Sequence, residues 1–276
     1  MEQEIQVLER IIRERRSVRT FDGQPIDRAD LDWLQFMIDG IETPYQIPVR
    51  FRLLDAAEHG LSSPVIVGER TYVAAAVPKV PHGEEAFGFA FETMVLDAWS
   101  MGLGTTWIGG TMDRKLFERA MELQPEERMP CVSPLGRPAA KMSLRETVMR
   151  RGAKATSREP FETRFFEGSF ETPLTEDQAG KLRLPLELVR LAPSAVNLQP
   201  WRAVVCGDLV HFYVAHKRGL MGEAVGDLQK VDLGIALCHF HKAAEALGMK
   251  PALEIADPGI PTPADTEYIA SYRVKG

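Results

Sequence analysis

Cysteine is scarce in this chain of 276 residues, which contains only three: Cys131, Cys206 and Cys238. They are widely spaced and odd in number, so they match neither a disulfide framework nor the close pairs of a metal site. Cys131 and Cys238 lie among apolar residues, which favours buried, unreactive thiols. We therefore expect reduced thiols and a cytoplasmic protein.

Long hydrophobic runs and blocks of one charge are also missing. No apolar stretch approaches the roughly 18 residues that cross a bilayer, and acidic residues follow Met1, so we expect neither a membrane span nor an export signal. The net charge is −6, without long runs of one sign. This balance argues against nucleic acid and membranes as partners. An anionic ligand would need a local basic cluster.

Several common functional motifs are absent as well. Without a G-x-G-x-x-G motif, the chain has no Rossmann domain of its own for NADH or NADPH. His239 and His241 are two residues apart on a predicted helix and point to different faces, so no metal site is expected. No Ser-His-Asp or Cys-His arrangement stands out. The chemistry must therefore come from other residues.

Apolar periodicity gives a coarse map of the secondary structure. It predicts helices over residues 3–16, 28–39, 113–121 and 182–191, and strands over 50–55, 65–67, 72–77, 131–135, 203–206 and 211–215. Two further helices, over 84–101 and 228–247, are apolar almost all round, which is typical of buried central helices. Gly102 and Gly248 follow them, as glycine does after helix ends.

Landmarks in the sequence recur at one offset. Gly248 follows Gly102 by about 146 residues, and Phe166-Glu167-Gly168 repeats the pattern of Phe21-Asp22-Gly23 about 145 residues later. A recurring offset predicts an internal duplication. We predict a first half over residues 1–145, a basic, irregular linker over 146–162 and a second half over 163–276.

A basic motif, Arg15-Arg16-Ser17-Val18-Arg19, lies where the first predicted helix gives way to extended chain. In an extended segment Arg15, Ser17 and Arg19 share one face. Such a face can hold a phosphate or another anionic group. The alternative is a solvated basic turn that offsets the dipole at the end of the helix.

The most informative stretch is Ala192-Pro193-Ser194-Ala195-Val196-Asn197-Leu198-Gln199-Pro200-Trp201. It resembles the A-P-S-x-x-N-x-Q-P-W signature of the nitroreductase family, which binds FMN. In that family an Arg-rich motif lies a short way upstream, whereas here the Arg-rich motif is about 175 residues away. The alternative is a proline-bounded helix end followed by a turn.

The resemblance implies an α+β, nitroreductase-like fold in which two pseudo-symmetric repeats form a pseudo-dimer within one chain. Each repeat would contain a mostly antiparallel sheet, with the two long helices at the pseudo-dimer core. Residues 38–44 and 163–166 stand where the missing copies of the two motifs would be. Each half therefore keeps the part that the other has lost, which predicts one complete FMN site per chain and a monomer.

The resemblance also implies roles for individual residues. Arg15 and Ser17, with Arg16 between them, would meet the phosphate-to-ribityl end or the pyrimidine edge of FMN. Arg19 would lie at the N1/O2 edge, where positive charge favours the reduced ring. From the second half, Pro193, Ser194 and Asn197 would cover the ring.

Two further segments of the first half would complete the site. Trp107-Ile108-Gly109-Gly110 resembles the family's stretch beside the ring, where the Gly110 N–H would meet N5. Leu135-Gly136-Arg137-Pro138 stands for a Gly-Tyr-Pro-like turn, with Arg137 replacing the aromatic residue. Lys141, and after it Arg145, would bind the phosphate. The alternative there is a basic linker face.

The implied activity is a ping-pong reduction. NADH or NADPH would give hydride to FMN, and a small-molecule acceptor such as a nitroaromatic or a quinone would take it. No side chain is predicted to act as a catalytic acid. Two other readings stay open: a flavin- or ligand-binding protein without turnover, and a scaffold without flavin.

Overall fold

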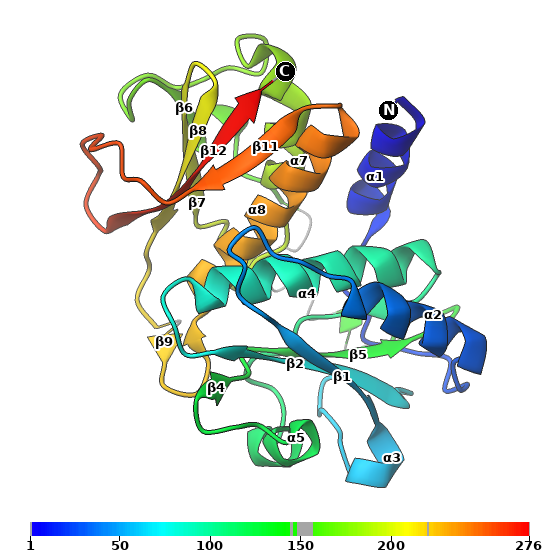
Figure 1. The fold of residues 1–276 in the computed structure, drawn as a ribbon. Coiled ribbons are helices and arrows are strands. Elements are labelled where there is room, and N and C mark those ends of the chain that lie inside the picture. The colour runs from blue at the N-terminus through cyan, green and yellow to red at the C-terminus, as the bar shows by residue number, and fades with distance from the viewer. Residues whose placement is uncertain (1, 144–145, 148–156, 220, 276) are drawn as a thin grey trace. The chain divides into compact units, whose positions relative to one another are not determined.

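The computed structural model describes residues 2–143, 146–147, 157–219 and 221–275 (Figure 1). The chain divides into two compact units. We call Glu14–Ala155 with Gly222–Gly226 the first-sheet unit, and Met1–Arg13 with Thr156–Met221 and Asp227–Gly276 the second-sheet unit. Each unit thus takes a short segment from the other half of the sequence. The predicted boundaries of the two halves and of the linker stay a prediction.

An antiparallel sheet of five strands organises the first-sheet unit. Its order is β1 (Arg50–Asp55), β2 (Thr71–Pro78), β5 (Val132–Gly136) and β3 (Gly104–Thr105), and β4 (Glu127–Arg128) pairs with the end of β2. The middle of β2 is a run of tyrosine, valine and alanine that is buried throughout. Such a run is expected of a strand covered on both faces.

Helices cover this sheet. The α5 helix (Arg114–Met121) packs Phe117 against Tyr72 of β2, with ring centroids 4.9 Å apart. The long α4 helix (Gly83–Ser100) also packs on β2 (Figure 1). Its Phe91 stacks on Phe51 of β1. Two other described helices of this unit are α2 (Arg28–Asp39) and α3 (Ala56–His59). Nearly all of α4 is buried, as its apolar composition predicts.

The second-sheet unit has a sheet of its own. The order is β11 (Lys250–Glu254), β12 (Thr266–Lys275), β8 (Leu209–Ala215), β7 (Trp201–Cys206) and β6 (Phe165–Glu167), and only the β6–β7 pair is parallel among these described strands. The long α8 helix (Leu228–Ala246) packs on this sheet, with Phe240 against Phe212. The other elements of this unit are α1 (Glu2–Glu14), α7 (Arg183–Arg190) and short 3-10 turns over Phe161–Thr163, Gly180–Leu182 and Ala195–Asn197. A small hairpin consists of β9 (Met221–Gly222) and β10 (Gly226–Asp227), and its residues Gly222–Gly226 belong to the first-sheet unit.

The recurring glycines adopt matching backbone conformations. After α4, Gly102 has a φ of 77°, and after α8, Gly248 has a φ of 78°. Gly23 and Gly168 have φ values of 75° and 70°. This left-handed region is open to glycine without steric cost, so each landmark performs the same local task in its own unit. The match is compatible with two repeats.

Most predicted elements are present. The helix over 28–39 is confirmed to the residue, and the two long helices end within two residues of their predicted bounds. Cys131 and Cys238 are buried as expected. The prediction of a strand over 65–67 is wrong, because Val67 forms an isolated bridge with Thr20 and belongs to no strand. β6, β11 and β12 have no predicted counterpart. Among the described helices none is long and apolar enough to cross a membrane.

Candidate functional site

The basic motif lies along the edge of the first sheet. After α1 ends at Glu14, Ser17 bridges Thr105 of β3 in parallel, and the Val18 N–H donates to the Thr105 carbonyl at 2.9 Å. Val18 is fully buried against Gly104, where a Cβ atom would come within 2.7 Å of the valine side chain. This close packing fixes the segment from which Arg15 and Arg19 extend.

Arg15 forms a buried ion pair with Glu92 of α4. The Arg15 Nε lies 3.7 Å from the Glu92 Oε1, and the two side chains are 6% and 0% exposed. The indole Nε1 of Trp107 donates to the other carboxylate oxygen at 3.2 Å. Yet the Arg15 Nε makes no hydrogen bond within the described part of the chain. A buried donor in this state favours a further acceptor.

Arg16 and the backbone of Arg19 meet a second carboxylate, that of Glu146. This carboxylate is buried and accepts from the Arg19 N–H at 3.2 Å, from the Thr20 hydroxyl at 2.8 Å and from the Arg16 Nη1 at 3.3 Å. Its charge balances part of the motif and holds the backbone between residues 16 and 20. The cofactor roles predicted for Arg16, Ser17 and Arg19 stay predictions.

The segment from Trp107 to Gly110 follows β3. The Trp107 ring packs 4.7 Å from the ring of Phe91, and Ile108 is buried and exchanges two hydrogen bonds of 2.9 Å with Val132. The Gly109 carbonyl accepts from the Arg114 guanidinium at 2.7 Å. A Cβ atom added to exposed Gly110 would meet nothing within 4 Å. Protein packing therefore does not require glycine at position 110.

In the segment predicted to bind the FMN phosphate, Arg137 already pairs with acidic side chains of the protein. Arg137, which replaces the aromatic residue of the family's turn, pairs with Asp27 at 2.8 Å and with Asp30 at 3.0 Å. Lys141 is exposed, and its role stays a prediction. Arg145 lies outside the described residues.

The Ala192–Trp201 loop belongs to the second-sheet unit and is tied down at several points. The Ala195 N–H donates to both oxygens of Asp232 in α8, at 2.9 and 3.1 Å. The Gln199 N–H donates to the Ser194 hydroxyl at 2.9 Å. Asn197 donates to the Ser157 carbonyl at 3.1 Å and accepts from Arg158 at 3.3 Å. Pro193 is partly exposed.

This loop also holds an unusual backbone. Val196, Asn197 and Gln199 have φ values of 45°, 58° and 51°. A β-branched residue such as valine rarely adopts this region, and residues held there cost about 1–3 kcal/mol each and tend to lie at functional sites. Val196 is also 70% exposed. The anchor at Asp232 therefore maintains a conformation that the local sequence does not favour.

Three site residues were not predicted: Glu92, Glu146 and Asp232. Sequence signals exist for two of them, because Glu92 and Asp232 are acidic residues in predominantly apolar helices. A carboxylate in such a position requires a partner. Glu146 carries no comparable signal.

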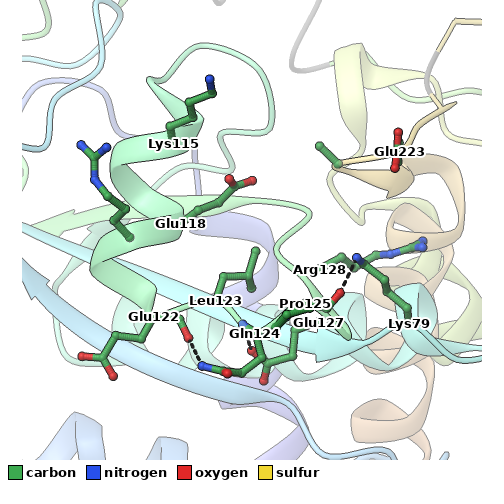
Figure 2. A pocket seen from close by; sticks show the side chains of 12 residues that line it. Lys79, Lys115, Glu118, Glu122, Leu123, Gln124, Pro125, Glu127, Arg128 and Glu223 are labelled. Atoms are coloured by element: carbon green, nitrogen blue, oxygen red, sulfur yellow. Dashed lines mark hydrogen bonds between the residues drawn. The ribbon is translucent and has the colours of Figure 1, made fainter.

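A cavity of about 670 Å³ lies elsewhere on the first-sheet unit, near α5 and β4 (Figure 2). Charged side chains line much of it, among them Lys79, Glu118, Arg128 and Glu223. It includes none of the predicted site residues.

The fold and the two motifs define a nitroreductase-like protein. A family model described as "Putative TM nitroreductase" matches residues 7–244, so the chain belongs to this family. A structure described as a putative nitroreductase from Thermotoga maritima is 20% identical, with a TM-score of 0.63, and the match covers 97% of this chain and 93% of that one. This likeness shows the fold. No curated protein matches the chain.

Shorter structures match about half of the chain. A nitroreductase family protein from Clostridium novyi is 20% identical with a TM-score of 0.41, over 48% of this chain and 86% of its own. An FMN-dependent nitroreductase from Clostridium difficile is 15% identical with a TM-score of 0.41, over 51% of this chain and 94% of its own.

Replacing Asp232 by asparagine should raise the free energy of unfolding at neutral pH but not at acidic pH. Burial raises the pKa of Asp232 well above its ordinary value; the Ala195 N–H lowers that pKa, and the charge of Asp227 raises it further. Such a group contributes stability below its unfolded pKa of about 4 and loses that contribution as the pH rises through its folded pKa.

Urea unfolding across this pH range measures the effect, with the exposed Asp208→Asn variant as the control. Asparagine keeps an oxygen for the Ala195 N–H, so the comparison isolates the charge. A variant less stable than the wild type at neutral pH would contradict the prediction.

Proposed function

We propose that this chain is an FMN-dependent oxidoreductase of the nitroreductase type. It would take electrons from NADH or NADPH and pass them to a small acceptor such as a nitroaromatic or a quinone. Membership of the family supports an oxidoreductase. The observation that carries the proposal is Arg15, whose buried guanidinium is held by Glu92 while its Nε still lacks a hydrogen-bond partner among the described residues.

The residues of the first-sheet unit fit FMN. The cofactor has an anionic phosphate and, once reduced, a ring that is largely anionic at N1. Arg15 offers a buried cation with a spare donor, and the buried hydroxyls of Thr105 and Thr106 also make no hydrogen bond within the described residues. Thr105 pairs with Ser17 of the basic motif. At Gly110 the backbone leaves room for a flat ring to approach.

Bound FMN would supply hydride chemistry, accepting two electrons from a nicotinamide at N5 and giving them to the second substrate. The chain would bind and orient. Arg15 and Ser17 would hold the phosphate-to-ribityl end or the pyrimidine edge, and Lys141 the phosphate. Arg19 would place positive charge at the N1/O2 edge, and the Gly110 N–H would donate to N5.

The second motif would supply the cover of the site. Pro193, Ser194 and Asn197 would lie over the ring, in a loop whose shape Asp232 maintains. Both motifs occur once, so we propose one site per chain. The chain would then act as a monomer whose two halves form an internal pseudo-dimer.

One observation favours a second candidate, a flavin-binding protein without turnover. The side-chain amide of Asn197 already donates to Ser157 and accepts from Arg158. If these bonds persist, the loop would not reorganise around a ring and an acceptor. FMN could then bind without reacting.

Absorbance spectra of the protein with FMN, before and after anaerobic addition of NADH or NADPH, test the proposal. The expected result is a bound-flavin spectrum that bleaches with the nicotinamide and recovers when a quinone is added. Binding without bleaching by either nicotinamide would favour the passive flavoprotein. Absence of FMN binding would refute the proposal.

Two substitutions should distinguish the contribution of Arg15 to FMN binding from that of its partner, Glu92. Arg15→Gln should weaken FMN binding about tenfold or more, because a charge-assisted hydrogen bond is worth about 1.5–3 kcal/mol. Glu92→Gln keeps an acceptor for Trp107 but leaves the guanidinium unpaired, so it should destabilise the protein without FMN. FMN should then stabilise Glu92→Gln more than it stabilises the wild type.

Thermal unfolding with and without FMN measures both effects. The control is Arg28→Gln, because that side chain is 87% exposed and forms an ion pair with Asp32 of the same helix. Equal loss of FMN binding in Glu92→Gln and Arg15→Gln would contradict the expected gain and would mean that Glu92 is needed to position Arg15 for the cofactor. Undiminished binding by Arg15→Gln would remove Arg15 from the site.

A further inference from the structure

A pair of arginines in the second-sheet unit is short of negative charge. Arg164 immediately precedes β6, and Arg202 lies on the neighbouring strand β7. The register pairs Phe165 with Ala203, and the Ala203 N–H donates to the Arg164 carbonyl at 3.0 Å. The two arginines therefore occupy adjacent positions on two strands that are hydrogen-bonded to each other.

Both guanidiniums are removed from water. The Arg164 side chain is only 11% exposed, and Arg202 is partly buried. Burial lowers the pKa of Arg202 to about 10; the like charge of Arg164 lowers it further, and the charge of Glu159 raises it. Burial likewise lowers the pKa of Arg164. Two desolvated charges of one sign at neighbouring positions are unfavourable unless an anion compensates them.

Within the described residues the compensation is incomplete. Arg164 has one carboxylate near it, that of half-exposed Glu159, at 3.8 Å. Arg202 has no carboxylate within 4 Å in the described chain, and its Nη1 donates to the neutral carbonyls of Trp201 and Gln199 at 2.7 and 3.3 Å. The buried Nε of Arg164 has no hydrogen-bond partner among these residues. Donors and positive charge are thus in excess.

We propose that Arg164 and Arg202 form a binding site for a small oxyanion, a phosphate or a carboxylate group. The site is separate from the basic motif at residues 15–19 and does not depend on the proposed flavin chemistry. Glu159 is tied to the Ala192–Trp201 loop, since its N–H donates to the Gln199 side chain at 3.0 Å. An anion bound at Arg164 would therefore compete with Glu159, a residue that is hydrogen-bonded to this loop.

Calorimetric titration of the full chain with inorganic phosphate, at an ionic strength kept constant with sodium chloride, tests the site. The wild type should bind saturably, and Arg202→Gln and Arg164→Gln should each weaken binding about tenfold or more. The control Arg183→Gln removes an exposed arginine of the same unit and should bind as the wild type does. Arg15→Gln should retain the binding that depends on Arg202, which distinguishes this site from the basic motif.

Acetate in competition separates the two ligand types. Displacement of phosphate by acetate would assign a carboxylate ligand as well, resistance to acetate would assign phosphate, and both results support the site. Circular dichroism melts confirm folding, and Arg202→Lys replaces Arg202→Gln if the latter does not fold, with weaker binding expected because lysine lacks the planar fork. No saturable binding by the wild type, or unchanged binding by folded Arg164 and Arg202 variants, would overturn the proposal.

Discussion

The buried pair of Glu92 and Arg15 is the constraint on which the first-sheet unit's part of the proposed site depends. Glu92 is fully buried in a helix made mostly of apolar residues, where an ionised carboxylate is unfavourable unless charge and hydrogen bonds meet it. Arg15 supplies the charge and the Trp107 indole supplies a hydrogen bond. One carboxylate on α4 therefore contacts two separate segments and helps to hold both, the basic motif and the stretch from Trp107 to Gly110. Both are segments that the proposed flavin site requires.

Asp232 of α8 has a comparable task in the second-sheet unit. It holds the Ala195 N–H and so stabilises a loop that places Val196 in a left-handed conformation. Each long helix thus carries a buried carboxylate that positions a motif far from it in sequence. The strained backbone of the loop and the burial of the two carboxyl groups both cost stability. Such costs are typical of functional sites, where a bound ligand uses the resulting geometry.

Sequence reasoning reached the fold more completely than the site. The apolar composition of residues 84–101 and 228–247 predicted the two central helices, because a helix that is hydrophobic all round must be buried. The predicted strand over residues 65–67 was wrong, since three apolar residues can form an isolated bridge without forming a strand. The motifs at residues 15–19 and 192–201, with residues 107–110 and Lys141, supplied the candidate site residues, whose roles stay predictions. The partners of those residues, Glu92, Glu146 and Asp232, depend on tertiary contacts between segments that are distant in sequence, which periodicity cannot reveal.

The central claim is that two half-sites on one chain make one flavin site. Native mass spectrometry of the protein saturated with FMN tests it most directly, because the chain mass and the number of cofactors are read from the same ion. The account predicts a single chain carrying one FMN. Two FMN on one chain would mean that each half has a working site, and one FMN shared by two chains would mean that the site forms between molecules. Either result would contradict the account.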